Sequence, residues 1–349
     1  MRKPYMFYTL AVLALSAVAF NACNKRHNNL GSNEDELQTP YSVYFSDSAG
    51  ILYNTNNGDV IKKLVFPADG YPSRALAVTG PAHIVWVKKN AHVSMDGGGT
   101  FGPTNLNVNP FAYNQSAILY AKDQERVYLA GSQGYGVIYN EKNGDPTAWQ
   151  IEPASGFDNG ITGAVSITSY AQLQNLEIFG YDDINNRLFK KDNKGDAWSE
   201  VFIDVNNFPH DAVGTSFSLA AYKNVLVAID SSDSLGVWYS TNGGGNWSQF
   251  AGLPAATKIA FAGAPFNEEL FVGTYYQGLY RLQAGVMVPA NEGLEAGIIV
   301  RGIKGKLERY KNDDEKRVVY LTTNKGIYRS YDIGRNWTKI KDGNFINVY

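Results

Sequence analysis

The sequence predicts an all-β chain folded as a seven-bladed β-propeller with four-stranded antiparallel blades. Three observations predict it: a short hairpin with a Gly-rich turn recurs seven times, the copies are spaced by about 40 to 51 residues, and the flanking segments alternate apolar and polar residues. This spacing matches the length of a propeller blade. Alternation of period two, rich in Tyr, Val, Ile and Phe, indicates strands rather than helical repeats of similar length.

The recurring hairpin consists of two or three apolar or aromatic residues, a polar residue, a Gly-rich turn and then an aromatic residue. Its clearest copies are residues 236–247, 326–337 and 91–101. Weaker copies run from Leu188 to Trp198 and from Gly136 to Trp149, and the faintest begin at Gly50 and Gly278. The turns therefore fall near residues 54, 94, 140, 191, 240, 282 and 330.

Two further apolar runs precede the typical copy, such as residues 217–220 and 226–229 before the turn near 240. With the stretch that starts at each Trp or Phe, they supply four strands per blade. The first blade lacks its innermost strand, because the fold starts at Tyr41 with what looks like a second strand. We predict that the alternating run from Phe345 to Tyr349 supplies it and closes the ring, which removes exposed sheet edges.

The composition favours a folded chain of many short strands. Of 349 residues, 44% are hydrophobic and 18% charged, with 35 glycines and 23 tyrosines. Disordered chains show the opposite balance. The net charge is −2, so the sequence does not indicate a nucleic-acid partner. No phosphate-binding glycine fingerprint lies between a predicted strand and a helix.

Three of the turns carry the pattern Ser-x-Asp-x-Gly-x-x-aromatic. The positions are Ser94, Asp96, Gly98 and Phe101; Ser240, Asn242, Gly244 and Trp247; and Ser330, Asp332, Gly334 and Trp337. The pattern resembles the Asp-box, or BNR repeat, of sialidases, xyloglucan-cleaving propellers, sortilin-type receptors and photosystem II assembly factors. The Asp or Asn side chain is expected to accept backbone hydrogen bonds across the turn, so we assign these residues a structural role. In related propellers they lie on the face away from the active site.

Residues 1–22 are predicted to form a signal peptide. Arg2 and Lys3 precede an apolar run of about 14 residues, from 7 to 20, and Ala22 is small. A membrane-spanning helix needs about 20 residues. The run is therefore better explained as the apolar core of a secretion signal than as a permanent anchor.

Cys23 is the only cysteine and follows this run directly. Residues 20–23, Phe-Asn-Ala-Cys, resemble the lipobox of bacterial lipoproteins, with matches at Ala22 and Cys23 and departures at Phe20 and Asn21. The resemblance implies lipidation of Cys23 and an outer-membrane location, in either the periplasmic or the surface leaflet. An ordinary signal with an incidental cysteine is the alternative. Residues 23–40 are polar and predicted to be a flexible tether to a propeller domain of residues 41–349.

Enzymatic chemistry finds little support in the sequence. The Arg-Ile-Pro motif of sialidases is absent. Other glycosidases need two facing carboxylates about 5 or 6.5–9.5 Å apart. The candidates on loops of the open face are Asp158, Asp182, Asp183, Asp211, Asp230, Asp233 and Glu292. His83 and His92 have no cysteine or carboxylate at metal-ligand spacing, and His27 in the tether and His210 in a loop are not expected to be ligands, so we predict no metal and no cofactor.

The loops between second and third strands and those between blades share one face of a propeller, and here they are rich in aromatic and amide residues. Such residues combine rigid contact area with adaptable hydrogen bonding, as recognition surfaces do. The candidate ligand-binding residues are Tyr71, Tyr135, Phe157, Tyr181, Tyr275, Tyr276 and Gln277. The adjacent pair Tyr275 and Tyr276, expected at a loop apex, is the foremost candidate.

The preferred function is a non-enzymatic, envelope-anchored binding or scaffold propeller. Its ligand would be a protein or a glycan, and it would act as a monomer or as a subunit of an envelope complex, such as an accessory to an outer-membrane uptake system. Two alternatives stay open: a glycoside hydrolase of the Asp-box propeller type, and an assembly factor for a membrane protein complex. The second rests on likeness of fold, which transfers no function by itself.

Overall fold

The structure is a computed structural model that describes residues 43–64, 70–106, 115–131, 136–152, 154–158, 165–202, 217–230, 236–310 and 314–349. Contacts divide the chain into two units. The smaller unit groups Leu307–Lys316 with Met1–Thr39. In its described part Arg309 Nε donates a hydrogen bond to Glu315 Oε1 at 2.8 Å, and Tyr310 donates one to Glu308 at 2.8 Å. The larger unit, residues 40–306 and 317–349, holds the propeller.

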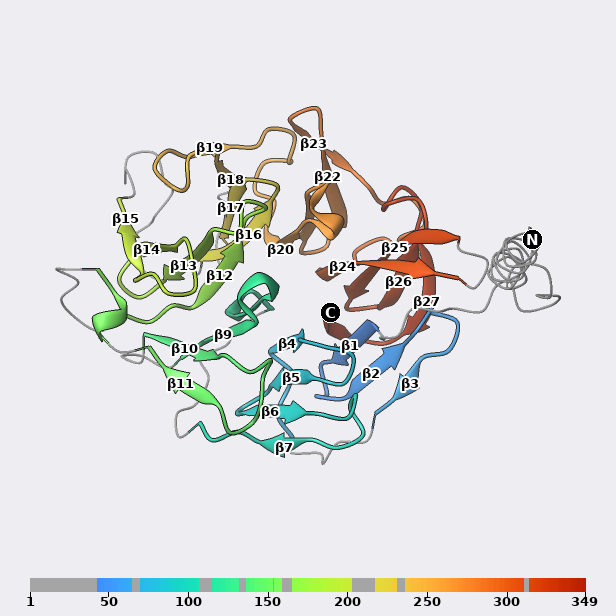
Figure 1. Cartoon of the computed structure of the whole chain (residues 1–349). Coiled ribbons are helices and arrows are strands. Elements are labelled where there is room, and N and C mark those ends of the chain that lie inside the picture. The colour runs from blue at the N-terminus through green and yellow to red at the C-terminus, as the bar shows by residue number, and fades with distance from the viewer. Residues whose placement is uncertain are drawn as a thin grey trace, which may run out of the picture. The chain divides into compact units, whose positions relative to one another are not determined.

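Seven four-stranded sheets make up the fold, and each is one blade of the ring seen in Figure 1. Blade 1 contains β28 (Phe345–Val348), β1 (Val43–Asp47), β2 (Leu52–Thr55) and β3 (Lys62–Lys63); blade 2 contains β4 (Ala75–Val78), β5 (Ile84–Val87), β6 (Ala91–Ser94) and β7 (Gly102–Pro103). Blade 3 contains β8 (Ile118–Ala121), β9 (Arg126–Ala130), β10 (Val137–Asn140) and β11 (Trp149–Ile151); blade 4 contains β12 (Ser169–Gln172), β13 (Ile178–Asp182), β14 (Arg187–Lys191) and β15 (Ser199–Val201).

The remaining three blades repeat the same antiparallel order. Blade 5 contains β16 (Phe217–Tyr222), β17 (Val225–Asp230), β18 (Val237–Ser240) and β19 (Ser248–Gln249); blade 6 contains β20 (Ile259–Gly263), β21 (Phe271–Thr274), β22 (Leu279–Gln283) and β23 (Val286–Pro289). Blade 7 contains β24 (Val300–Arg309), β25 (Glu315–Thr323), β26 (Gly326–Ser330) and β27 (Thr338–Asp342). The predicted seven-bladed fold is therefore confirmed, and the seven Gly-rich turns join the third and fourth strand of each blade.

Four short 3-10 helices complete the described secondary structure: η1 (Gln115–Ala117), η2 (Lys122–Gln124), η3 (Ala154–Gly156) and η4 (Pro265–Asn267). Helix η1 contacts the innermost strands β4, β12 and β16, which belong to three different blades, so it lies within the central channel. Among the described residues, no helix combines the length and apolar character needed to cross a membrane.

The order of the strands defines two faces of the ring. The upper face carries the loops between second and third strands and the connections between blades. The lower face carries the loops between first and second strands and the Gly-rich turns between third and fourth strands. The innermost strands line the channel that joins the two faces.

Apolar side chains fill the junctions between blades. The described buried residues form seven clusters, and each cluster joins two neighbouring blades. The aromatic residue after a Gly-rich turn packs toward the preceding blade: Trp198 and Trp247 do so at 0% and 6% exposure. Burial of one such side chain stabilises the fold by about 1.5–3 kcal/mol. Each blade thus depends on both of its neighbours.

The C-terminal strand closes the ring. Strand β28 pairs antiparallel with β1, with Phe45 opposite Val348, and Tyr44 and Tyr349 exchange two backbone hydrogen bonds of 2.9 Å. Phe345 and Val348 are buried in the cluster between blades 7 and 1. The prediction that the end of the chain supplies the missing inner strand of blade 1 is correct.

Deletion of residues 344–349 should abolish cooperative unfolding and cause aggregation, because it exposes the edge of β1 and opens the junction between blades 7 and 1. Phe345→Ala alone should lower the free energy of unfolding by about 3–5 kcal/mol. Asp342→Ala is the control, since the Asp342 side chain is 90% exposed and should change stability by at most about 0.5 kcal/mol. Circular dichroism melts and size-exclusion chromatography test this; a deleted chain with an unchanged melting temperature would contradict it.

Three lower-face turns share one hydrogen-bond pattern. In each, the serine hydroxyl accepts a 2.8 Å bond from the glycine amide four residues on, at Gly98, Gly244 and Gly334. The same hydroxyl donates to the Asp or Asn two residues on, at 2.7–2.9 Å. That side chain accepts a 2.9 Å bond from the amide four residues further along. The pattern is local and structural, while membership of the Asp-box repeat stays a prediction.

The glycine in this pattern is required by close packing. Gly244 has a φ of +95°, and a Cβ there would lie 2.3 Å from Leu188 of the preceding blade. The turn therefore packs against blade 4 without a side chain between them. At the equivalent turn of blade 7, hydrogen bonds from Asn336, Ser330 and the Arg335 amide outweigh the effect of burial and lower the pKa of Asp332 to about 2.

Asp332→Ala should lower the free energy of unfolding by about 1–2 kcal/mol, because it removes the acceptor for the Ser330 hydroxyl and two backbone amides. This decrease in the free energy of unfolding should be largest near pH 7. It should become smaller as pH falls from about 4 toward 2, where Asp332 itself becomes protonated. Asp332→Asn should be nearly neutral, since Asn242 occupies the equivalent position of blade 5. Denaturant unfolding at pH 7 tests this, and equal stability of the Ala and Asn variants would refute it.

Candidate functional site

The loop joining β21 to β22, residues 275–278, presents two tyrosines on the upper face. Tyr276 is 65% exposed and Tyr275 is half-buried. Their ring centroids lie 6.5 Å apart with planes tilted by 55°. Gln277 completes the apex, and its Oε1 accepts a 2.6 Å hydrogen bond from the Thr257 hydroxyl. The structure thus brings three of the predicted ligand-binding residues together.

Backbone hydrogen bonds hold this loop on both sides. Tyr275 N donates to Lys258 O and Tyr276 N to Ile298 O, each at 3.0 Å, so the loop is tied to the connections before and after blade 6. The Thr274 hydroxyl donates to Gly278 O at 2.7 Å and accepts from Gln277 N at 3.1 Å. Tyr276 has a φ of 71°, a left-handed conformation that costs energy for a residue with a side chain. The tyrosine pair is therefore presented by a pre-ordered backbone.

Two cations flank the tyrosine pair. Lys258 Nζ lies 5.5 Å from the Tyr275 ring centroid. Arg301, at the start of the innermost strand of blade 7, donates to Asn344 Oδ1 at 2.6 Å. Burial lowers the pKa of Arg301, and the neighbouring Tyr275 and Tyr276 oppose this shift. We call Tyr275, Tyr276, Lys258, Arg301 and Asn344 the tyrosine site.

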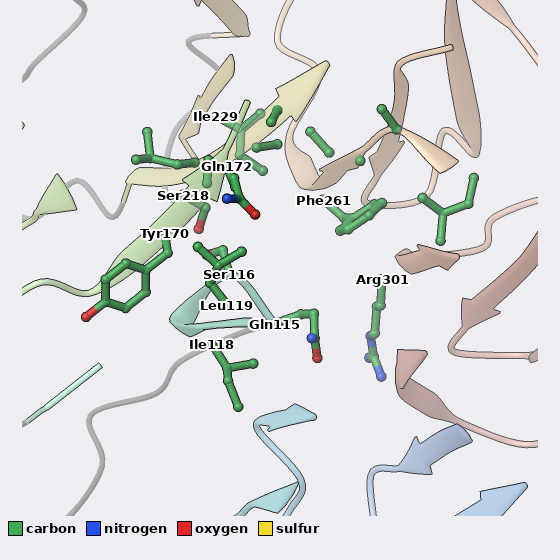
Figure 2. Close-up of a pocket in the computed structure, with 18 of the residues that line it drawn as sticks. Gln115, Ser116, Ile118, Leu119, Tyr170, Gln172, Ser218, Ile229, Phe261 and Arg301 are labelled. Atoms are coloured by element: carbon green, nitrogen blue, oxygen red, sulfur yellow. The ribbon is translucent and has the colours of Figure 1, made fainter. Parts of the chain in front are cut away.

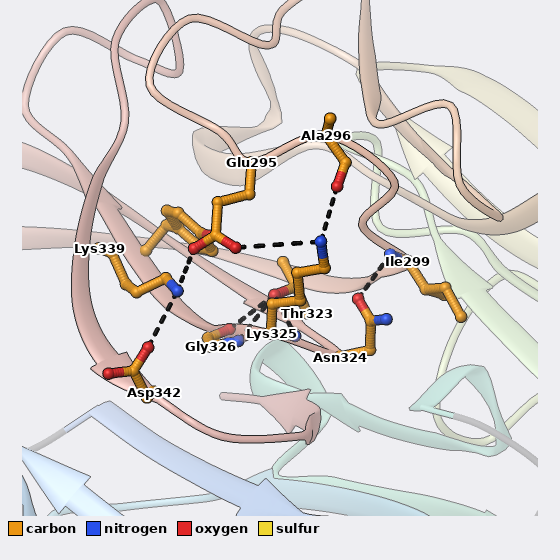
Figure 3. Close-up of polar contacts among 10 residues, drawn as sticks. Glu295, Ala296, Ile299, Thr323, Asn324, Lys325, Gly326, Lys339 and Asp342 are labelled. Atoms are coloured by element: carbon orange, nitrogen blue, oxygen red, sulfur yellow. Dashed lines mark hydrogen bonds and ion pairs between the residues drawn. The ribbon is translucent and has the colours of Figure 1, made fainter.

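A polar network in blade 7 supports the connection on which Tyr276 rests (Figure 3). Lys325 Nζ donates to Ala296 O at 2.7 Å and pairs with Glu295 at 3.9 Å. Asn324 Oδ1 accepts a 2.7 Å bond from Ile299 N, next to the Ile298 carbonyl that holds Tyr276. Glu295 also pairs with Lys339, which lowers the pKa of Glu295. The network fixes residues 295–299 against the loop of blade 7.

The channel beside the tyrosine site contains a pocket of about 270 Å³. Arg301 and Phe261 line it together with Gln115 of η1, and Figure 2 shows Arg301 across from Gln115. The Gln115 amide makes two hydrogen bonds to the backbone of Leu76, of 3.0 and 2.6 Å, and so covers part of the open edge of β4. None of the described residues that line this pocket is Asp or Glu.

Two other predicted ligand-binding residues lie apart from the tyrosine site. Tyr71 is 40% exposed on the connection between blades 1 and 2, where Lys89 Nζ lies 5.1 Å from its ring. Phe157 is half-buried and packs edge-on against Phe189 at 5.6 Å. Tyr135 lies outside the described residues.

The prediction that Tyr181 lies in a loop is wrong. Tyr181 belongs to β13 and is 1% exposed, with its ring packed edge-on against Phe217 of blade 5. Its hydroxyl donates to Asn186 Oδ1 at 2.5 Å. Tyr181 therefore belongs to the core, because the strand continues through a position whose acidic neighbours suggested a loop.

Asp182 and Asp230 are not loop residues either, since they end β13 and β17 and are 0% exposed. Asp182 accepts bonds from Ser166 N and from the amide side chain of Asn185, at 3.3 and 2.7 Å, as a turn-forming residue does. Asp183 is half-buried, and burial, with smaller contributions from Asp182 and Asp230, raises its pKa to about 6. Its contribution to stability is thus most favourable below pH 4 and declines as pH rises through 6.

The other candidate acids are either exposed or not described. Asp158 and Glu292 are exposed, and Asp211 and Asp233 lie outside the described residues. Within the part of the chain that the structure describes, no three His, Cys, Asp or Glu side chains are grouped as metal ligands. Cys23 and the tether also lie outside the described residues.

No protein-family model matches the chain, and no curated protein sequence matches it significantly. Solved structures with a similar fold include YCF48 from Cyanidioschyzon merolae, at 15% identity and a TM-score of 0.55, covering 80% of this chain and 87% of that one. A YCF48 bound to D1 peptide has 15% identity and a TM-score of 0.51, covering 88% and 86%. A catalytically inactive virginiamycin B lyase from Staphylococcus aureus with quinupristin has 11% identity and a TM-score of 0.53, covering 82% and 97%. At these identities the likeness shows the fold alone.

Lys258, Arg301 and Asn344 of the tyrosine site were not identified from the sequence. They come from the connection before blade 6, the innermost strand of blade 7 and the connection into β28. No motif links them, because only the closed ring brings these three segments to one place. The available signal was the position of Lys258 and Asn344 just before the predicted strands that begin at Ile259 and Phe345, while no strand was predicted at Arg301.

Proposed function

We propose that this chain is a non-enzymatic binding propeller whose upper face recognises a segment of a protein partner at the tyrosine site. The observation that carries the proposal is the pre-ordered pair Tyr275 and Tyr276, exposed beside Lys258 and Arg301. A tyrosine pair fixed before binding loses little conformational freedom when a partner docks, so more of its contact energy is available for affinity. The two cations favour a segment with acidic or carbonyl groups.

The comparison with a YCF48 bound to D1 peptide supports a peptide ligand only in that a propeller of similar fold has one. A glycan is the alternative ligand, since tyrosine faces also stack on sugar rings. The described lining of the pocket beside Arg301 contains no carboxylate, so these residues offer a glycoside hydrolase no acid–base pair. Roles in an uptake system or in assembly of a membrane complex are versions of the same binding proposal.

Tyr275→Ala combined with Tyr276→Ala should weaken partner binding by at least about tenfold, since central aromatic anchors carry about 2 kcal/mol or more of binding energy. Tyr331→Ala is the matched control, because Tyr331 is 49% exposed but lies on a lower-face turn. Peptide and glycan arrays with the chain from Thr39 onward identify the ligand, and titration gives the affinity. Unchanged binding by the double variant would refute the assignment of the site.

We also propose that the propeller is tethered to the bacterial outer membrane by lipidation of Cys23. The proposal rests on the apolar leader, the lipobox-like residues Ala22 and Cys23, and the polar stretch to residue 40. Several acyl chains are needed for stable attachment, since one chain binds a membrane only marginally. An upper face held by a flexible tether would reach partners embedded in the same membrane.

Cys23→Ser should move the protein from the detergent phase to the aqueous phase in a phase-partitioning experiment, because no acyl chain remains. Ser32→Ala, in the same polar stretch, should partition like the unaltered chain. Mass spectrometry of the N-terminal peptide provides the direct readout. An unmodified Cys23 in a membrane-associated protein would exclude the lipid anchor.

A further inference from the structure

A second cavity opens at the lower end of the channel, on the face opposite the tyrosine site. Its volume is about 530 Å³, and its lining includes Thr79, Tyr120, Lys122, Lys304, Lys306 and Tyr349. These residues come from blades 1, 2, 3 and 7. Among the described residues, the lining contains three lysines and no Asp or Glu. We call this cavity the Lys304 pocket.

The Lys304 ammonium is the centre of this pocket. It is half-buried, and its Nζ lies 3.9 Å from the centroid of the Tyr349 ring. Among the described residues no carboxylate pairs with it. Burial alone lowers the pKa of Lys304 to about 8. Removing a cation from water without a counter-ion is unfavourable. A bound anion at this position would offset the desolvation free energy of the Lys304 ammonium.

The other polar side chains of the described lining include two lysines and two tyrosines. Lys306 is buried and its ammonium donates a hydrogen bond to the Asn56 carbonyl, so it adds positive charge to the wall of the pocket. Lys122 is exposed at the rim of the pocket. Burial raises the pKa of Tyr349 and that of Tyr120, so both phenols stay protonated at neutral pH. The Tyr120 hydroxyl donates to Asn143 Oδ1 at 2.9 Å, which fixes the ring in place.

We propose that the Lys304 pocket binds a small molecule that carries an oxyanion, either a phosphate or a carboxylate group. Lys304 and Lys122, with Lys306 in the wall, provide positive charge in a described lining that has no acidic residue, and the Tyr120 and Tyr349 rings provide a stacking surface. The volume lies within the range of small-molecule sites. The proposal is independent of the tyrosine site, because the two sites lie at opposite ends of the channel.

Lys304→Met tests the proposal in the full-length protein, since it keeps the apolar length of the side chain and removes its charge. Calorimetric titration with pyrophosphate and with citrate separates the two sources of the oxyanion. The variant should bind the preferred anion at least about tenfold more weakly than the unaltered chain. Lys194→Ala, at an exposed lower-face lysine of blade 4, should bind as the unaltered chain does.

Two readouts distinguish a lost site from a damaged fold. Without anion, Lys304→Met should melt at the same or a higher temperature near pH 7, because an uncompensated cation is gone. Sulfate, whose charge is constant in this range, should bind the unaltered chain more weakly as pH rises from 7 to 9.5 and Lys304 loses its proton, with little change for the variant. Equal anion affinity in the variant and the unaltered chain, or no binding of pyrophosphate and citrate, would overturn the proposal.

Discussion

Burial of apolar side chains between neighbouring blades is the interaction on which every other feature of this chain depends. Each four-stranded sheet has two apolar faces and covers neither by itself, so the seven junctions form one continuous belt. The belt has no ends only because β28 pairs with β1. Asn347 connects this closure to the next junction, since its amide donates to Ser46 of blade 1 and to Ser73 before blade 2, each at 3.1 Å.

The two faces of the ring have different physical roles. On the lower face, serine and aspartate or asparagine side chains accept hydrogen bonds from the backbone amides of tight turns. These hydrogen bonds join residues of the same turn. On the upper face, the loop of blade 6 takes its backbone hydrogen bonds from its neighbours, and the Tyr276 ring stays exposed. Hydrogen bonds from blade 7 offset the unfavourable energy of the left-handed Tyr276 conformation. Lys325 and Asn324 hold residues 295–299, the connection to which Tyr276 is bonded. The site is therefore as rigid as the junction beneath it.

Local patterns made the fold predictable from the sequence. Gly-rich turns, period-two alternation and the repeat length are each encoded within one blade, and the missing first strand identified the run at Phe345 as its replacement. The tyrosine pair was found in the same way, because two adjacent aromatic residues followed a predicted strand. The prediction that Tyr181 lies in a loop was wrong, because two aspartates follow Tyr181 as in a loop, whereas β13 continues through Asp182.

The groups that the sequence did not reveal are those that only the closed ring assembles. Arg301 interacts electrostatically with the tyrosine pair of blade 6, and Lys304, three residues further along β24, lines a cavity together with residues of blades 1, 2 and 3. The positions of Arg301 and Lys304 in the sequence do not indicate which residues of other blades lie near them. A charged residue on an innermost strand is the general signal to look for, since such strands border the channel on their open edge.

The pairing of the last strand with the first also sets the order of events during biosynthesis. While the ribosome is still adding residues, blades 2 to 7 can stack in sequence, but blade 1 stays incomplete until β28 emerges. Contacts between residues about three hundred positions apart form slowly, because a long loop must close first. A nascent chain interrupted anywhere before Phe345 would keep an open edge that proteases and chaperones can recognise.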